Sequence, residues 1–283
     1  MPPKPKQDPP SSTGAQVEQS GPLKLLRPFI LLSWSGYYII PTIINLLLTF
    51  NLTPFSSPSK FKDEWFARFW VFFGPKSRDV AGPKVVPLIH NNATGVCLDI
   101  GPGTGQWLDL FARAANPDIT KIYGVEPNKG MHSDLRTNAV RAGLGDVYEV
   151  IGCGAEALRT KGGLQENSID TIITVQCLCS IPTPEVIIKE LYPLLKPGGR
   201  WLVYEHVRTK YSGDFVYYWQ KLINLVWPHF FNGCDICRPT DEWLLRSGEW
   251  EEVNLRPGQG EGPYDTLPHV IGTLTKKRFE PLQ

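Results

Sequence analysis

Hydrophobic and polar positions are arranged differently before and after about residue 95 of the chain. Beyond this point, short apolar or β-branched runs alternate with longer segments of helical spacing. The runs that predict strands lie at Val96–Ile100, Lys121–Glu126, Val147–Cys153, Ser168–Val175 and Arg200–His206. Strands that alternate with helices predict an α/β fold with a doubly wound, mostly parallel, Rossmann-like sheet. Two later runs, near 250–255 and 269–274, predict an antiparallel edge.

The N-terminal part has a polar tail followed by a long apolar segment. Residues 1–22 are rich in Pro, Ser, Gln and Lys, and we expect them to be disordered. The 23 residues Pro28–Phe50 carry no charge, which is enough to cross a ~30 Å hydrocarbon core as a helix. We therefore expect residues 23–53 to be a hydrophobic membrane segment and anchor. A core-packing helix of a soluble protein is the alternative.

Pro41 lies inside this apolar segment, where a proline removes a backbone hydrogen bond. Two arrangements remain open: a kinked span, or a hairpin bent near residues 36–41. Basic residues stand on both sides, with Lys24 and Arg27 before the segment and Lys60 after it. This distribution fits a hairpin with both ends in the cytosol at least as well as a span.

Residues 54–94 contain many aromatic side chains, and we interpret them as linker and lid helices. The aromatic residues are Phe61, Trp65, Phe66, Phe69, Trp70, Phe72 and Phe73. An amphipathic helix packed on the sheet is the alternative. A second aromatic block, Phe215–Phe231, follows the fifth predicted strand. Two such blocks predict a dry, apolar pocket for a lipophilic molecule.

Composition narrows the function classes. The chain has 283 residues, a formal net charge of +1 and six cysteines. A near-neutral chain without a basic, aromatic-rich cluster is not typical of nucleic-acid binding. Cys234 and Cys237 have the spacing of a zinc half-site, but no second pair follows. We expect no metal and interpret these thiols as part of a loop over the pocket.

The stretch after the first predicted strand carries the strongest functional signal. Asp99 is followed by glycines at alternate positions, Gly101, Gly103 and Gly105. A dinucleotide site requires its third glycine at position 106 or 108, and neither residue is a glycine. The Asp99 carboxylate would repel a pyrophosphate but suits the ammonium and sulfonium groups of S-adenosylmethionine. The pattern therefore favours that cofactor over NAD. Residues 107–115 have helical spacing and predict a helix after the turn.

Other candidate cofactor residues stand where predicted strands end. Glu126 is placed to accept the ribose hydroxyls, and Pro127 follows it. Glu156, in the turn after the third strand, would lie near the amino edge of adenine, unless the backbone there does the reading. Val175 ends the fourth strand. A solvated surface acid is the alternative for either glutamate.

Methyl transfer from a sulfonium requires a nucleophile held in line, and a base assists when the nucleophile must lose a proton. His206 is the candidate catalytic base, because it lies at the carboxyl end of the fifth strand. A structural histidine is the alternative. Glu205 either holds the tautomer of His206 or faces the helix layer.

The order of these motifs, with Lys196–Gly199 before the fifth strand, resembles class I S-adenosylmethionine-dependent methyltransferases. Further motifs resemble the small membrane-anchored methyltransferase-like proteins of the endoplasmic reticulum and lipid droplets. These motifs are Gly124–Asn128, Leu178–Ser180, Pro197–Gly199, Glu205–Val207, Tyr218–Gln220, Trp227 and Phe231–Cys234. The resemblance implies a methyltransferase domain over residues 95–276, a cytosol-facing active site, and S-methylation of an alkyl thiol.

This sequence departs from the branch at several positions. Glu126 stands in place of an Asp, Pro102 in place of a Cys, and Cys237-Arg238 in place of Thr-Arg, while residues 161–166 extend a turn. These departures concern the methyl acceptor more than the cofactor. Two alternatives stay open: an O-methyltransferase of secondary metabolism acting on a phenol or carboxyl, and a non-catalytic cofactor-binding scaffold at a membrane or lipid surface.

Overall fold

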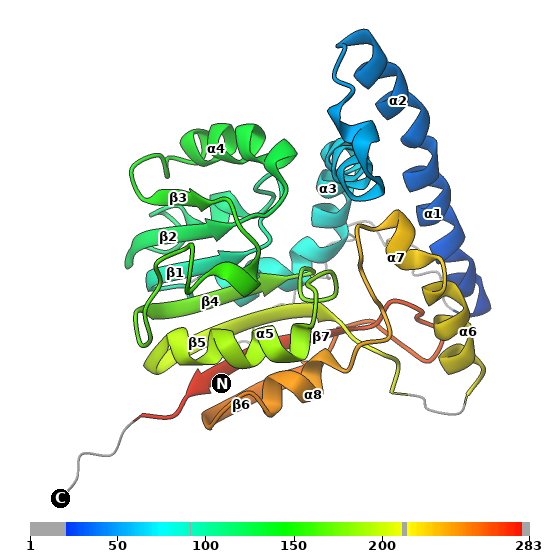
Figure 1. Cartoon of the computed structure of the whole chain (residues 1–283). Coiled ribbons are helices and arrows are strands. Elements are labelled where there is room, and N and C mark those ends of the chain that lie inside the picture. Colours follow the sequence, from blue (N-terminus) through cyan, green and yellow to red (C-terminus); the bar gives the residue numbers. More distant parts are fainter. Residues whose placement is uncertain (1–20, 91, 211–213, 279–283) are drawn as a thin grey trace, which may run out of the picture.

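The computed structural model describes residues 21–90, 92–210 and 214–278. Of the tail expected to be disordered (residues 1–22), residues 1–20 lie outside the described residues, whereas Pro22 begins a 3₁₀ helix, Pro22–Leu26, which contradicts disorder at that residue. A twisted central sheet is flanked by helices, and α1 (Arg27–Tyr37) and α2 (Ile39–Leu48) rise along one side of it (Figure 1).

The sheet has seven strands in the order β3-β2-β1-β4-β5-β7-β6. The strands are β1 (Gly95–Ile100), β2 (Ile119–Val125), β3 (Tyr148–Ile151), β4 (Ile169–Val175), β5 (Leu195–His206), β6 (Trp250–Pro257) and β7 (His269–Lys276). The first five strands pair in parallel, whereas β7 pairs antiparallel with both β5 and β6. The predicted doubly wound, mostly parallel sheet with an antiparallel edge is confirmed.

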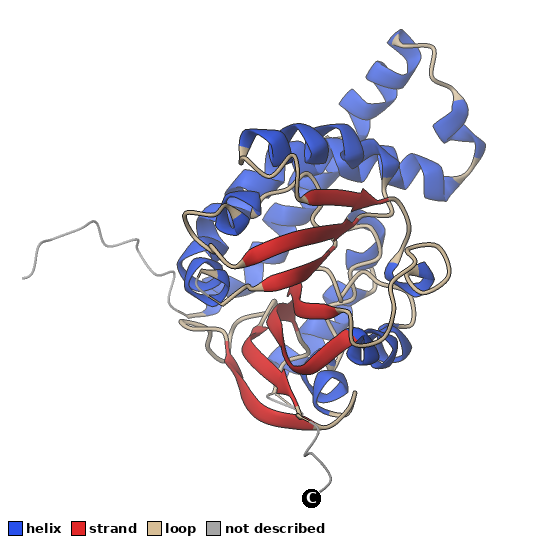
Figure 2. Cartoon of the chain, turned by 90° about the vertical axis from the view of Figure 1, so that its left-hand side faces the viewer, coloured by secondary structure: helices blue, strands red, loops and turns tan. Residues whose placement is uncertain are grey.

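Helices cover both faces of this sheet (Figure 2). The remaining helices are α3 (Pro58–Ile89), α4 (His132–Arg141), α5 (Pro184–Leu191), α6 (Phe215–Asn224), α7 (Trp227–Phe230) and α8 (Thr240–Leu245). One core cluster joins the sheet to α5 and α8, and another joins it to α4 and the C-terminal half of α3. A strand that is covered on both faces has apolar side chains on both faces. This explains why the strands of this sheet appear in the sequence as nearly continuous apolar runs.

The helix expected over residues 107–115 is wrong. Only a 3₁₀ helix, Leu108–Phe111, forms after the glycine turn. The Asn116 side-chain amide donates to the Leu110 carbonyl at 2.6 Å, and Pro117 follows. This bond takes the carbonyl that the next helical turn would need, so the chain turns toward β2 instead.

The Pro197-Gly198-Gly199 segment is also placed differently. Rather than forming a turn before the fifth strand, it belongs to β5, which begins at Leu195. The pairing register with β4 shifts here, from Ile169 opposite Leu195 to Thr171 opposite Arg200. The two glycines are therefore accommodated in a bulge, which is where glycine is tolerated within a strand.

The apolar N-terminal segment forms a kinked helical stretch and not a hairpin bent near residues 36–41. Figure 1 shows α2 continuing beyond α1 after a break at Tyr38, and the chain reverses only after Leu48. The break places Pro41 in the first turn of α2, where its missing N–H costs no helical hydrogen bond. Residues Pro22–Leu48 are long and apolar enough to cross a membrane, and only 22% of their apolar window is buried. This exposure contradicts the core-helix alternative.

The aromatic segment is a single 32-residue helix, α3, with prolines at positions 75, 83 and 87. Its N-terminal half buries Trp65 and Phe69 against the N-terminal helices and α7. Its C-terminal half buries Val85 and Ile89 against the sheet. The helix therefore connects the N-terminal helices to the core and joins two of the three apolar clusters.

Candidate functional site

The glycine turn after β1 has a left-handed backbone that only glycine adopts readily. Gly101, Gly103 and Gly105 have φ values of +66°, +60° and +85°. A Cβ on Gly101 would lie 2.6 Å from the Cβ of Cys177, and one on Gly103 would lie 2.7 Å from Trp70 Nε1. Neighbouring protein atoms thus require glycine here.

Two carboxylates stand beside this turn and are almost fully enclosed. Asp99 is 9% exposed and accepts from the Tyr148 hydroxyl at 3.1 Å. Glu126 is 6% exposed and accepts from the backbone N–H groups of Gly103 at 3.0 Å and Asn128 at 2.8 Å. Burial raises the pKa of each carboxyl to about 7, despite these hydrogen bonds. Neither has a cation as partner among the interactions of the described residues.

This environment fits the cofactor expected from the sequence. An enclosed carboxylate without a counter-ion is destabilised, and a cationic ligand with hydroxyl groups would relieve that cost. The indole N–H of Trp70, next to Gly103, is also buried without a hydrogen-bond partner. A buried N–H group without a partner, beside two buried carboxylates without a cation, is consistent with a polar ligand at this turn.

The other expected cofactor residues lie along the same carboxyl edge of the sheet. Pro127 is exposed directly after Glu126, and Val175 is half-buried at the end of β4. Glu156 is exposed in a 3₁₀ turn after β3, and its carboxylate folds back over Gly154. The fold thus brings the ends of four strands together, as parallel topology requires.

A cavity of about 440 Å³ opens where β4 and β5 end. Its walls are mainly apolar and come from α1 (Ile30, Leu31, Trp34), α3 (Phe66, Trp70, Phe73) and the α7 region (Trp227, Phe231, Cys234). Its polar groups include Gln176, His206 and His269. A mostly apolar cavity with a few convergent polar groups is typical of small-molecule sites. Both aromatic segments line it, as does α1.

His206 lies in the wall of this cavity, and its side chain is partly buried. Its Nδ1 atom is buried and has no hydrogen-bond partner among the described residues. Burial, with His269 second, lowers the pKa of His206, so the imidazole is neutral. Glu205 points to the opposite face of β5, where it accepts from the backbone N–H groups of Cys177 and Leu178, both at 3.1 Å. Of the two roles expected for Glu205, the structure has the one that faces the helix layer.

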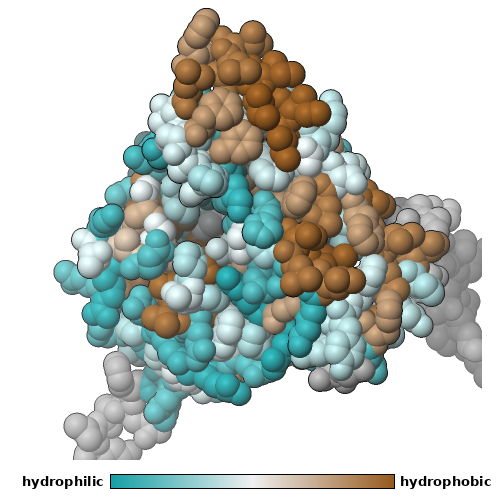
Figure 3. Space-filling model, turned by 45° about the vertical axis from the view of Figure 1, so that its right-hand side comes forward, coloured by the Kyte–Doolittle hydropathy of each residue, from teal (hydrophilic) through white to brown (hydrophobic). Residues whose placement is uncertain are grey.

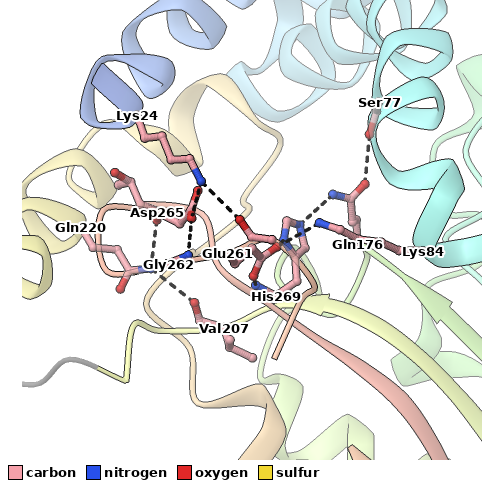
Figure 4. A network of polar contacts seen from close by, with 12 residues as sticks. Lys24, Ser77, Lys84, Gln176, Val207, Gln220, Glu261, Gly262, Asp265 and His269 are labelled. Atoms are coloured by element: carbon pink, nitrogen blue, oxygen red, sulfur yellow. Dashed lines mark hydrogen bonds and ion pairs between the residues drawn. The ribbon is translucent and has the colours of Figure 1, made fainter. Parts of the chain in front are cut away.

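Sequence reasoning missed a charged network next to His206. His269, the cross-strand partner of His206 on β7, contacts Glu261 through Nδ1 at 2.6 Å. Figure 4 shows Gln176, Lys84 and Ser77 arranged around this pair. The sequence carries one indirect signal, since His269 begins a predicted strand and Gln176 follows one. Only the β5–β7 pairing shows that they meet.

Cys234 and Cys237, the two residues of the C-x-x-C spacing, lie in different environments. Cys234 lines the cavity with its Sγ atom 3.0 Å from that of Cys179, and both thiols are free. Cys237 lies apart from this contact and forms a backbone hydrogen bond with Asp235. Within the ranges that the structure describes, no three His, Cys, Asp or Glu side chains come close enough to hold a metal ion.

Comparisons with known proteins agree with this geometry. Residues 98–203, which contain the glycine turn and β1 to β5, match a family model described as a methyltransferase domain. Thiol S-methyltransferase TMT1B of Rattus norvegicus is 27% identical over 185 residues, covering 63% of this chain and 70% of its own length. Human thiol S-methyltransferase TMT1A is 25% identical over 182 residues, with the same coverage of both chains.

A solved structure extends the likeness beyond the matched domain. An O-methyltransferase family protein from Burkholderia thailandensis superposes with a TM-score of 0.56 at 15% identity. The superposition covers 86% of this chain and 72% of that one. At this identity the likeness concerns the fold alone.

Proposed function

Because this chain is a class I S-adenosylmethionine-dependent methyltransferase, we propose that it methylates the sulfur of a lipophilic thiol at a membrane surface. The observation that carries the proposal is the apolar cavity next to the glycine turn. Its aromatic walls suit an apolar acceptor, and its polar groups include Gln176 and His206 where β4 and β5 end. The choice of sulfur rests on relatives that are named thiol S-methyltransferases.

The cofactor, when bound, supplies a methyl group that its sulfonium has already activated. We propose that Asp99 faces the cationic part of the cofactor and that Glu126 accepts its ribose hydroxyls. Gly101, Gly103 and Gly105 form the turn beneath it. The remaining proposed contacts are Pro127, Glu156 and Val175. The cavity walls exclude water, which would otherwise solvate the nucleophile.

The proposed membrane contact rests on exposed apolar residues of the N-terminal helices and α6. In Figure 3, hydrophobic residues gather at the tip formed by α2 and along the side that carries α1 and α6. Exposed members include Phe29, Ile40 and Leu48 of the N-terminal helices, and Leu222 of α6. Phe29 and Trp219 pack edge to face at 5.7 Å and join the two elements. Large apolar patches of this kind mark membrane or protein contacts.

Because α1 is both part of this surface and a wall of the cavity, we propose that a lipophilic acceptor reaches the cavity from the lipid side. From the sequence motifs that resemble membrane-anchored methyltransferase-like proteins, we propose the endoplasmic reticulum or a lipid droplet, with the catalytic domain facing the cytosol. Methylation of a phenol or carboxyl is the second candidate, and it is tested by the same experiment.

The test is a panel of acceptors incubated with the full-length protein and methyl-labelled cofactor. The panel pairs hexanethiol with hexanol, thiophenol with phenol, decanethiol with mercaptoethanol, and hexanoic acid with decanoic acid. We expect label in the thioether products, with decanethiol preferred over mercaptoethanol because the cavity is apolar. Label only in ether or ester products would assign oxygen as the acceptor atom. No transfer to any member, with the cofactor bound, would favour the scaffold alternative.

A further inference from the structure

The cavity contains a proton-accepting pair that the motif analysis did not identify. The side chains of Glu261 and His269 face each other at its polar end, and both are only about a tenth exposed (12% and 11%). Glu261 lies in the β6–β7 loop, while His269 begins β7. A carboxylate that holds a buried imidazole is the arrangement that orients a histidine base.

The contacts of Glu261 determine which nitrogen of His269 carries the proton. Its Oε2 accepts from the His269 backbone N–H at 2.6 Å, and its Oε1 lies 2.6 Å from Nδ1. A carboxylate only accepts, so Nδ1 carries the hydrogen and Nε2 has the free lone pair. Burial raises the pKa of the Glu261 carboxyl, and Lys84 Nζ, 3.5 Å from Oε1, opposes this shift together with the His269 backbone N–H.

Gln176 shows where a ligand donor would sit. Its side-chain Nε2 is 3.0 Å from His269 Nε2, and its Oε1 accepts from the Ser77 hydroxyl at 3.0 Å. The serine thus orients the amide so that its N–H group points at the histidine lone pair (Figure 4). Gln176 also has a left-handed backbone, with φ of +53° at the end of β4. Such strain in a non-glycine residue is concentrated at functional sites.

The neighbouring His206 is worse placed for this task. Its Nδ1 is buried without a hydrogen-bond partner in the described part of the chain, so no carboxylate there orients this ring as Glu261 orients that of His269. The rings of His206 and His269 lie 4.2 Å apart with a 34° tilt, so His206 packs on His269 and fixes its plane. This contact makes His206 a positioning residue.

We propose that the Glu261–His269 pair is the general base of the methyl transfer, with His269 Nε2 accepting the proton of the thiol. The proposal rests on the proposed thiol methylation. In the ligand-free protein, the Gln176 amide occupies the place of the thiol hydrogen.

The balance of the step is simple. The S–H bond of the acceptor breaks, its proton moves to His269 Nε2, and its electron pair stays on sulfur. That sulfur forms a bond to the methyl carbon, while the bond from this carbon to the donor sulfur breaks and leaves its pair there. The imidazolium, held by the Glu261 carboxylate, releases the proton to water when the product leaves.

The charges around His269 keep it neutral before the reaction. The titratable or charged groups that face it are Lys24, Arg27, Lys84, Tyr204, His206, Glu261 and Asp265. Burial, followed by Lys84 and Arg27, lowers the pKa of His269 to about 3. The Nε2 lone pair is therefore unprotonated between pH 6 and 9, and the thiol proton moves to it only as the sulfur bonds to the methyl carbon, which makes the S–H group strongly acidic. Wild-type kcat/KM for a thiol should then vary little over this pH range.

The first experiment measures kcat/KM for hexanethiol against pH in the full-length protein. His269→Asn keeps an N–H for Glu261 but removes the Nε2 lone pair. We expect a loss of about 10²- to 10⁴-fold at pH 7, with recovery toward pH 9 as the thiol, whose pKa is about 8.5 or above, ionises by itself. The exposed His90→Asn is the matched control and should match wild type. An H269N profile as flat and as fast as wild type overturns the proposal.

The second experiment needs no turnover. Nitrogen-15 NMR of the ligand-free protein reports which ring nitrogen of His269 is protonated. We expect Nδ1–H in wild type and in the exposed control Glu252→Gln. Glu261→Gln should give Nε2–H, because the new amide N–H faces Nδ1. Nε2–H in wild type overturns the assignment of the base. Absence of thiol methylation by wild type would instead refute the proposed function, whatever the tautomer.

Discussion

Buried carboxylates dominate this site at the scale of single residues. Asp99, Glu126 and Glu205 are each at most 9% exposed, and burial raises the pKa of each carboxyl to about 7. Glu205 is used structurally, because it caps the backbone after β4. Glu126 likewise accepts from two backbone N–H groups and Asp99 from Tyr148, and these two carboxyls are the ones that we propose contact the ligand. Ligand sites often retain groups that are costly to the free protein.

This cost predicts a pH-dependent stability of the ligand-free protein. Folding raises the pKa of each of these carboxyls from about 4 to about 7. Their contribution to the stability of the folded state is therefore complete below pH 4, where both states are protonated. It is lost as the pH rises through about 7. For Asp99 the loss is on the order of 4 kcal/mol. We therefore expect the melting temperature to fall by several degrees between pH 5 and pH 8.

Asp99→Asn separates stability from binding. The amide oxygen still accepts from Tyr148 but carries no charge, so the variant should melt higher than wild type at pH 8, and the difference should shrink as pH falls toward 4. Its affinity for the cofactor should fall by at least about tenfold, as measured by calorimetry. The exposed Asp146→Asn serves as control. Unchanged affinity in D99N would refute the proposed role of Asp99.

At the scale of elements, α1 has two functions in one helix. It presents apolar residues to the outside, and it closes the cavity with Leu31. It is also tied to the catalytic domain, since Ser35 Oγ donates to the Phe230 carbonyl at 2.7 Å and Trp65 Nε1 donates to the Ser35 carbonyl at 2.8 Å. An anchor connected by a free linker would need no such contacts.

Removal of residues 1–48 should therefore do more than release the protein from membranes. Several apolar side chains leave the cavity wall, and each is worth ~1.5–3 kcal/mol when buried. We expect the KM for hexanethiol to rise by about 10- to 100-fold, with cofactor affinity preserved because the glycine turn is untouched. Steady-state kinetics and calorimetry measure the two effects. Removal of residues 1–20 is the control, and an unchanged KM in the longer deletion would contradict the wall role of α1.

The whole molecule has a polar side and an apolar side. The exposed apolar residues of α1, α2 and α6 lie on one side, while α4 lies across the sheet from α6 (Figure 1). The proposed membrane contact would therefore include the catalytic domain through α6 as well as the N-terminal helices. In this proposal the cavity would face the lipid from which an apolar acceptor comes.

This arrangement predicts a position-dependent effect of charge on membrane binding. Leu222→Glu in α6 places a carboxylate on the apolar side, where its desolvation is costly. We expect binding to phosphatidylcholine vesicles to weaken by about tenfold, which corresponds to ~1.4 kcal/mol. Val140→Glu in α4 is the matched control, because Val140 is similarly exposed, 66% against 55% for Leu222. Flotation measures both, and equal binding of L222E and wild type would limit the contact to the N-terminal helices.

The sequence alone determined the strands, the carboxyl edge with Asp99, the glycine turn and Glu126, and the exposed apolar segment. These features depend on local patterns: apolar periodicity, glycine spacing and the order of strand ends. The sequence pattern gave a wrong prediction for the helix over residues 107–115, because the Asn116 side chain takes the Leu110 carbonyl that this helix would need.

Which residues line the cavity together depends on tertiary contacts and could not be predicted from the sequence. His269 and Glu261 lie more than fifty residues beyond His206, and the antiparallel pairing of β5 with β7 brings them together. Likewise, α1 forms part of the cavity wall, although the apolar sequence of this segment indicates only a membrane anchor. Contacts between distant segments depend on packing and register, which no local pattern contains.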